Sequence, residues 1–294
     1  MPDRPVAKYD IAVAYRIYPK MAKPAEGLPF SDDKYRLSEL CLHSFRRSLG
    51  DLRAKVWVLL DGCPEEYAEL FQKYFVPEDL VLIRLPGVGN AQTFSRQMDI
   101  LMNQQDADLV HFAEDDYVYR PDEFKLLVNF MRSHPDADFV SPYDHSEYYR
   151  MELLHKPSWI RSFQDRHWRS SATTCLTFLT SRATLRKTRW MFHTYVLGNW
   201  DWSVWLSLTK MNVFKPVDFW RWLARDRFPI KILIKTWFFG GAQILFGKRY
   251  RLWSPMPAIA THLDVNGLSA GTDWISLMKE EEQSIRCGTV SRER

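Results

Sequence analysis

The chain has 294 residues, of which 46% are hydrophobic and 26% charged, a composition that predicts a large packed core and excludes an intrinsically disordered chain. Forty Lys and Arg residues against 36 Asp and Glu residues leave a net charge of +4, which is too small and too dispersed to indicate wholesale nucleic-acid binding. We therefore expect no nucleic-acid partner.

The compartment is indicated by the cysteines and by the N-terminus. Four cysteines lie far apart without a CxxC pair, which favours a reducing environment over a zinc knuckle or a disulfide framework. The first residues, MPDRPVAKYDIAVAY, lack the basic start, apolar core and cleavage site of a secretory signal. No uncharged apolar run reaches the length of about 18 residues that a bilayer-spanning helix needs. We expect a cytoplasmic protein.

The first half alternates short apolar strands with helices. Strands are predicted at 9–15, 55–60, 80–85, 108–113 and 138–141, and helices at 34–49, 64–75, 91–104 and 121–133. Such alternation predicts an α/β fold with a mostly parallel sheet flanked by helices and with ligands at the carboxyl ends of the strands. We expect residues 1–142 to form a donor-binding half of the nucleotide-binding type.

The second half is less regular. The expected elements are an extended stretch at 170–180, helices at 181–188 and 200–209, and a second extended stretch at 255–264. We assign residues 143–264 to an acceptor-binding half and residues 265–294 to a C-terminal loop and helix.

Three consecutive acids, Glu114, Asp115 and Asp116, follow the apolar strand at 108–113. Carboxylates held this close repel one another unless a cation neutralises them, and a hard divalent metal suits that task. Mg²⁺ or Mn²⁺ held by one or two carboxylates takes its other ligands from water and substrate phosphates. The triplet therefore indicates a metal site for a diphosphate-bearing substrate, and the alternative is a solvated acidic turn.

The order of several segments over about residues 9–142 resembles family 2 nucleotide-sugar glycosyltransferases with the GT-A fold. LSELCLHSFRRSL followed by AKVWVLLDGCPEEY is similar to that family's first helix and second strand. LPGVGNAQTFSRQMDILMNQQDADLVHFAEDDY is similar to its glycine loop, helix and Asp-x-Asp strand. The chain departs from the family at Ala14-Tyr15-Arg16-Ile17, where Pro-Thr-Tyr-Asn is frequent.

The resemblance implies roles for residues around the nucleotide. Tyr15 and Arg16 would border the nucleotide pocket, and Asp61 would bind the base or ribose. Gly89 and Asn90 would let the backbone approach the nucleotide closely. The alternatives are an ordinary turn at Asp61 and a surface ion pair at Arg16.

The resemblance also implies the metal ligands. Asp116 would be the principal ligand, with Glu114 beside it and Asp115 next to the ribose. His262 would reach the metal or the diphosphate from the C-terminal part of the chain, although a lone histidine is more often a structural hydrogen-bonding residue.

A fourth acid, Asp201, opens the helix at 200–209. In the resembled family, an acid at the start of a helix in this part of the chain deprotonates the acceptor hydroxyl. A helix N-terminus favours the ionised form that a base requires. Trp200 and Trp202 on either side are suited to stacking on an acceptor sugar. The alternative is that Asp201 only caps the helix.

The resemblance thus implies a metal-dependent, inverting transfer of a sugar from a UDP- or GDP-sugar to a glycan or lipid-linked acceptor. Two other functions stay open. A nucleotidyltransferase would share the acidic metal site but needs a Gly/Lys/Arg-rich loop after the first strand, which 17–33 lacks. The other is a carbohydrate-binding or scaffold protein that has the same fold but no catalytic activity.

The segment 219–253 is both basic and aromatic. Eight Lys and Arg residues face a single acid, Asp226, so the segment has a net charge of +7. This pattern suits a segment on an anionic membrane surface, which would place the protein at the inner face of the membrane. The alternative is a pair of helices packed on the catalytic domain with solvated cations.

Overall fold

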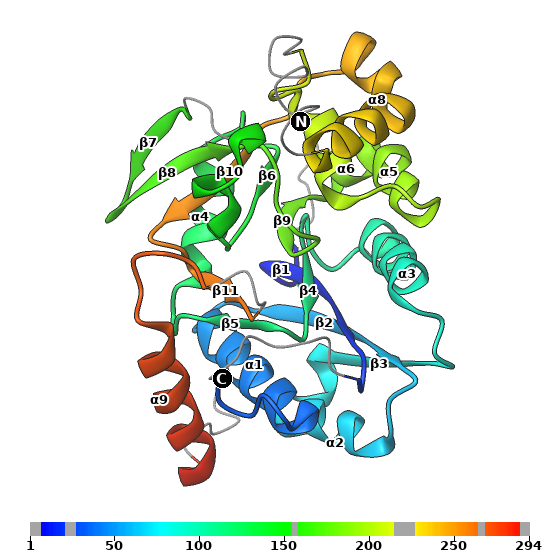
Figure 1. Ribbon diagram of the computed structural model, residues 1–294. Helices are drawn as coiled ribbons and strands as arrows, with labels where there is room; N and C mark the ends of the chain where they lie inside the picture. The colour runs from blue at the N-terminus through cyan, green and yellow to red at the C-terminus, as the bar shows by residue number, and fades with distance from the viewer. Residues whose placement is uncertain (1–6, 21–27, 155–157, 215–226, 264–267, 289–294) are drawn as a thin grey trace.

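A computed structural model of the chain describes residues 7–20, 28–154, 158–214, 227–263 and 268–288 (Figure 1). The strands are β1 (Ile11–Ile17), β2 (Ala54–Asp61), β3 (Leu80–Leu85), β4 (Leu109–Glu114), β5 (Tyr117–Tyr119), β6 (Phe139–Val140), β7 (Ile160–Phe163), β8 (Arg166–Ser171), β9 (Phe178–Ser181), β10 (Leu252–Met256) and β11 (Ala260–His262). The helices are α1 (Lys34–Leu49), α2 (Glu65–Tyr74), α3 (Asn90–Asn103), α4 (Phe124–Ser133), α5 (Arg182–Val196), α6 (Asp201–Thr209), α8 (Phe228–Phe246) and α9 (Trp274–Cys287).

Nine strands form one sheet in the order β3-β2-β1-β4-β9-β6-β10-β8-β7. Strands β3, β2, β1 and β4 are parallel, β9 is antiparallel to both of its neighbours, and β8 is antiparallel to β10 and β7. A second, two-stranded sheet pairs β5 with β11. The mixed α/β fold predicted from the alternating pattern is confirmed, and the large sheet continues through both halves of the chain.

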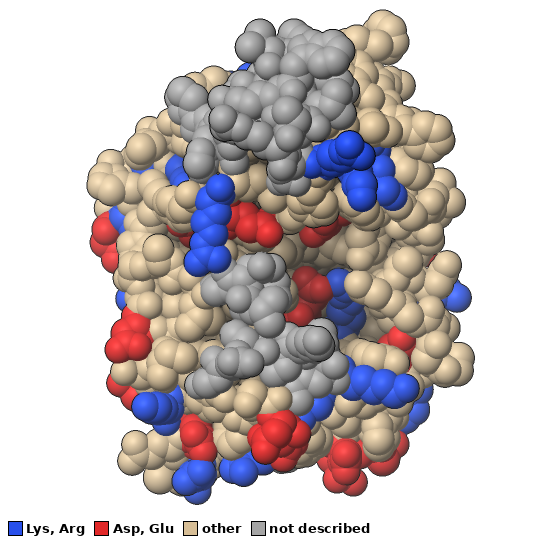
Figure 2. All heavy atoms as spheres, viewed as in Figure 1, with Lys and Arg blue, Asp and Glu red and all other residues tan. Residues whose placement is uncertain are grey.

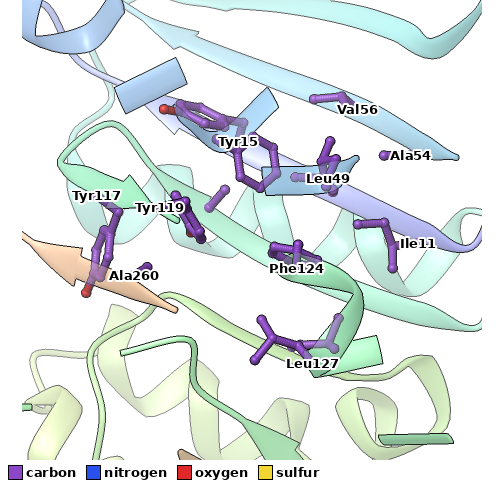
Figure 3. Close-up of a cluster of buried hydrophobic side chains, with 14 of the residues drawn as sticks. Ile11, Tyr15, Leu49, Ala54, Val56, Tyr117, Tyr119, Phe124, Leu127 and Ala260 are labelled. Carbon is purple, nitrogen blue, oxygen red and sulfur yellow. The ribbon is translucent and has the colours of Figure 1, made fainter. Parts of the chain in front are cut away.

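Strand β1 shows why helices cover both faces of the sheet. All seven of its residues are buried, and successive side chains of a strand point to opposite faces. Ile11, Val13 and Tyr15 pack in the core under α1, α2 and α4, as Figure 3 shows in part. Ala12 and Ala14 face the second core, under α3, α5 and α6. A strand that is apolar on both sides therefore lies inside the sheet between two helical layers.

Helix boundaries follow local chemistry. The side chain of Asp33 accepts a hydrogen bond from the amide of Arg36 at the start of α1, and Gly50 ends that helix with a φ of +55°. A side-chain cap at the first turn and a glycine in the left-handed region after the last turn are the usual signals of a helix start and stop. Helix α1 consequently has the bounds expected from sequence.

Three features differ from the expectations. Strand β5 and the hairpin of β7 and β8 are not anticipated: β5 and β7 have only three and four residues, which is too short for a periodic pattern, and β8 is a mostly polar run, RHWRSS. Helix α5 is 15 residues long, well beyond the expected 181–188. Of the basic aromatic segment, 219–226 lies outside the described residues, and the rest contains α8 and the first two residues of β10. Among the described helices, none combines the length and apolarity needed to cross a bilayer.

Candidate active site

The candidate site lies where β1, β2 and β4 end. These parallel strands are neighbours, and their register places Arg16 of β1 opposite Glu114 of β4, with Asp61 at the end of β2. The carboxyl ends of parallel strands meet at one edge of a sheet, where ligands of open α/β folds gather. Figure 2 shows, near the middle of the displayed face, a hollow in which acidic and basic side chains lie side by side.

Glu114 is held by two residues, Arg16 and Thr177. One of its carboxylate oxygens pairs with the Arg16 guanidinium, and the other accepts a hydrogen bond of 2.7 Å from the Thr177 hydroxyl. Arg16 also donates to the side chain of Asn90, the first residue of α3. Burial would lower the pKa of Arg16, but the charge of Glu114 outweighs it and raises that pKa. Both oxygens of the predicted ligand Glu114 are thus already engaged.

Asp115 pairs with a residue that the motif did not include. The Lys34 ammonium, at the start of α1, lies 2.5 Å from the Asp115 carboxylate, and both side chains are largely buried. The amide of Tyr18 donates a longer hydrogen bond of 3.4 Å to the same carboxylate. Burial and the neighbouring Asp116 raise the pKa of Asp115, while Lys34 acts in the opposite direction. Lys34 therefore provides part of the neutralising charge that we expected from a metal alone.

Asp116 and His262 meet although 145 residues separate them in the chain. Strand β11 pairs with β5 so that His262 stands opposite Tyr117, and its Nε2 lies 3.0 Å from Asp116 Oδ2. Burial would raise the pKa of Asp116, but His262 outweighs it and lowers that pKa. The other oxygen, Oδ1, is buried and has no hydrogen-bond partner among the described residues. The Asp116 side chain is thus a carboxylate whose Oδ1 has no hydrogen-bond partner among the described residues.

A divalent ion fits this pair better than it fits the full triplet. No group of three or more His, Cys, Asp or Glu side chains in the described ranges is arranged to hold a metal. Mg²⁺ and Mn²⁺ sites at phosphates nonetheless often use only one or two protein ligands. The unpartnered Asp116 Oδ1 would provide an oxygen donor, and His262 would provide a nitrogen donor once its Nε2 exchanged Asp116 for the ion. Both oxygens of Glu114 are bonded to other residues.

Asp61 organises the glycine loop. Its two carboxylate oxygens accept hydrogen bonds of 2.7 and 2.8 Å from the amides of Val88 and Gly89. Gly89 has a φ of +83°, and a Cβ built there would meet no atom within 4 Å. The glycine is therefore required by backbone conformation, and the space beside it is open to a ligand. Asp61 thus fixes this loop, and its predicted contact with a base or ribose stays a prediction.

Tyr15 belongs to the core and does not border an open pocket. Its ring is buried between Phe45 and Phe71, with centroid distances of 5.8 and 5.1 Å. Because side chains alternate along β1, Tyr15 faces α1 and α2, whereas Arg16 faces α3. Of the two residues placed at the nucleotide by the resemblance, only Arg16 reaches the acid cluster.

Asp201 is the first residue of α6, and the preceding Trp200 is the N-cap. Its Oδ1 accepts a hydrogen bond of 2.8 Å from the amide of Trp202. Burial raises the pKa of Asp201 to about 6, with a further contribution from the negative charge of Glu114. His262 acts in the opposite direction. Asp201 therefore interacts electrostatically with the strand-end acids and titrates just below neutral pH.

The tryptophans on either side of Asp201 are half-buried and pack on α8. The Trp200 and Trp202 rings lie 5.9 and 5.1 Å from that of Phe228, and the Lys235 ammonium lies 4.8 Å from the Trp200 centroid. Their predicted stacking on an acceptor sugar stays a prediction.

Sequence reasoning missed Lys34, Thr177 and Tyr195. The Tyr195 hydroxyl accepts a hydrogen bond of 3.1 Å from Asn90, and Thr177 precedes β9 beside the end of β4. None of these residues stands in a recognisable motif. Only the sheet topology, with β9 inserted next to β4, brings Thr177 to the acids.

No protein-family model and no curated protein matches the sequence. Among solved structures, S. aureus TarS 1-349 is similar with a TM-score of 0.44 and 13% identity, over 77% of this chain and 70% of that chain. Its complex with UDP-GlcNAc is similar with a TM-score of 0.41 and 15% identity, over 61% of this chain and only 47% of that chain. The galactosyltransferase LgtC with donor and acceptor sugar analogues is similar with a TM-score of 0.44 and 11% identity, over 96% of this chain and 97% of that chain. At TM-scores and identities this low, the likeness by itself assigns no activity.

Proposed function

We propose that the protein is a glycosyltransferase that moves a sugar from a nucleoside diphosphate sugar, a UDP- or GDP-sugar, to an acceptor hydroxyl with inversion at the anomeric carbon. The observation that carries the proposal is a pair of carboxylates with opposite properties in one site. His262 lowers the pKa of Asp116, while burial raises the pKa of Asp201 to about 6. Environments that separate the pKa values of two acids are typical of sites in which the acids have different roles.

The strand-end cluster suits the donor diphosphate. Arg16 and Lys34 bring fixed positive charges to this edge of the sheet, and the loop held by Asp61 offers close backbone approach at Gly89. Asp116 and His262 would hold Mn²⁺ or Mg²⁺, with the ion's remaining ligands coming from the diphosphate and water. When bound, the ion stabilises the negative charge that develops on the departing diphosphate.

Asp201 suits the acceptor side. Its carboxylate accepts the proton of the acceptor hydroxyl while the acceptor oxygen bonds to the anomeric carbon. The bond from that carbon to the diphosphate oxygen breaks at the same time, and the electron pair leaves with the diphosphate. Because attack and departure occur on opposite faces of the sugar, a single displacement inverts the anomeric configuration.

The experiment is a panel of UDP- and GDP-sugars, each incubated with the protein and Mn²⁺, with released nucleoside diphosphate measured. The purified protein should release nucleoside diphosphate from one donor, and Asp116→Asn and Asp201→Asn should each abolish that release while the circular dichroism spectrum is retained. Asp165→Asn, an exposed acid on the turn between β7 and β8, is the matched control.

Two other results would replace the proposal. Release of pyrophosphate from a nucleoside triphosphate and a sugar phosphate would assign a nucleotidyltransferase. Stabilisation by a donor without any release of nucleoside diphosphate, even with acceptors present, would assign a binding protein that lacks catalysis.

A further inference from the structure

Helix α8 exposes large apolar side chains. Ile234 is 61% exposed, Phe238 79%, Leu245 57% and Phe246 86%. Single exposed apolar residues are common on soluble proteins, but a group of them on one surface is typical of a site that contacts another protein or a membrane. These four residues are called the α8 patch below.

The inner face of α8 combines three buried isoleucines, Ile230, Ile232 and Ile244, with small and polar residues. A Cβ at Gly240 would collide with the Ser207 side chain of α6. The hydroxyl groups of Ser203 and Ser207 donate hydrogen bonds of 3.2 and 3.3 Å to the carbonyls of Ile232 and Thr236 on α8. Close packing through small residues, with serine hydroxyls bonding across helices, is the arrangement used where the surroundings are lipid. Helix α8 is thus apolar on its outer face as well as in part of its inner face, unlike a surface helix exposed only to water.

Two cations share the exposed face with the patch. Residues 227, 231, 234, 238 and 245 are spaced by three, four or seven positions, which places them on one side of a helix. Arg227 and Lys231 are both exposed there. The stretch 227–251 contains six Lys and Arg residues and no Asp or Glu. An apolar stripe with cations and without acids is complementary to an anionic bilayer surface.

The first turn of α8 contacts the residues on either side of the candidate base. The Phe228 ring, at the start of α8, contacts Trp200 and Trp202, which precede and follow Asp201. Figure 1 shows α8 and α6 side by side in the same helical layer, far from the hairpin of β7 and β8. A surface bound through α8 would therefore lie near the acceptor side of the site.

We propose that α8 binds the protein to an anionic membrane surface, with Ile234, Phe238, Leu245 and Phe246 among the lipid headgroups and Arg227 and Lys231 against their phosphates. The helix lies on the surface and does not cross it, since it contains Lys231 and Lys235 and fails the apolarity needed for a span. Resting on the proposed function, this places the acceptor hydroxyl on a membrane-borne glycolipid. A second copy of the chain is the poorer occupant, because two such basic faces would repel each other.

The test is flotation of the full chain with vesicles of phosphatidylcholine alone or mixed with phosphatidylglycerol. The protein should float with the anionic vesicles and more weakly with the neutral ones. Phe238→Ser/Phe246→Ser should reduce binding to both vesicles by about tenfold or more, because binding scales with inserted apolar area. Arg227→Glu/Lys231→Glu should weaken binding to the anionic vesicles alone by about tenfold or more.

The matched control is Ile160→Ser, which removes an equally exposed apolar side chain (62%) from β7 and should float like the unaltered protein. The substituted residues are exposed, so all variants should keep their melting temperatures. Vesicle binding requires no catalysis, so flotation without sugar transfer would leave the membrane proposal intact and remove the proposed function.

Three results would overturn the membrane proposal. The first is the absence of flotation with anionic vesicles, and the second is flotation unaffected by the Phe238→Ser/Phe246→Ser pair. The third is a dimer in solution that this pair dissociates while vesicle binding is absent, which would make a second copy of the chain the occupant of the α8 patch.

Discussion

The two sides of the candidate site stabilise their polar groups in different ways. At the strand ends each acid has a polar partner in the chain: Arg16 and Thr177 for Glu114, Lys34 for Asp115 and His262 for Asp116. At α6 the acid Asp201 accepts a backbone amide hydrogen bond, with no cation paired to it among the described residues. A buried carboxylate without a cation is costly to ionise. On the proposed function, the donor side would stay charged and the acceptor side would exchange a proton.

The same contrast extends to packing. Behind the strand ends lies a core of large aromatic rings, with Phe45 within 6 Å of several neighbours. Behind Asp201, α6 and α8 approach closely through Ser207 and Gly240, and α8 also carries large apolar side chains on its exposed face. The first arrangement suits a rigid frame for a charged donor, and the second suits a helix pair that presents an apolar face to a partner.

The largest effect is expected at Asp201. Asp201→Asn should lower kcat by about 10²–10⁴-fold, the usual contribution of a general base, because an amide cannot accept the proton of the acceptor hydroxyl. Donor affinity, measured by thermal shift with Mn²⁺, should stay unchanged, since the donor cluster is intact. Unchanged kcat in this variant would show that the two sides do not have different roles.

The packing contrast predicts a loss of stability at Gly240. Gly240→Ala places a methyl group against Ser207 and should lower the free energy of unfolding by about 1–3 kcal/mol, the usual cost of overpacking. Gly241→Ala is the matched control one residue away. Its methyl group would meet only Trp237, at 3.9 Å, so it should be neutral or stabilise the helix by about 1 kcal/mol. Urea unfolding curves compare the two.

On the donor side, the loop amides depend on Asp61. Asp61→Ala removes the acceptors of Val88 and Gly89 and should destabilise the protein by about 1–3 kcal/mol for each amide left unpaired. Donor Kd should rise because the loop loses its fixed position, while kcat at saturating donor changes little. Donor Kd is measured by isothermal titration calorimetry. Asp61→Asn, which keeps one acceptor oxygen, should give a donor Kd between those of the unaltered protein and Asp61→Ala. Equal donor Kd in all three proteins would contradict a positioning role.

The smallest expected effect concerns pH. The base is the ionised form of Asp201, so kcat/KM should fall as the pH drops through about 6, the pKa that burial gives this carboxyl. Glu114→Gln removes a negative charge that raises this pKa, so the acidic limb of the pH profile of kcat/KM should move to lower pH. The shift should be a fraction of a unit, because burial is the larger cause. Glu65→Gln, on the exposed start of α2, should leave the limb in place.

Much of the donor half was predictable from the sequence because strands β1 to β4 are short apolar runs separated by helices with clear starts and stops. The acids at 114–116 were found because like charges at a strand end are unusual. Their partners were not found, since Lys34 belongs to an ordinary amphipathic helix and Thr177 reaches Glu114 only through an antiparallel insertion in the sheet. The packing of the Tyr15 ring between Phe45 and Phe71 was not foreseen either, because the resemblance did not indicate which face of β1 the ring occupies.

The pairing of β5 with β11 has a consequence for how the protein is made. Asp116 leaves the ribosome well before His262, so the carboxylate pocket acquires its imidazole only after almost all of the sheet has been synthesised. On stalled ribosomes, donor binding with Mn²⁺ should therefore appear only in nascent chains long enough for β11 to clear the exit tunnel. A partly translated chain would neither capture nor consume the activated sugar.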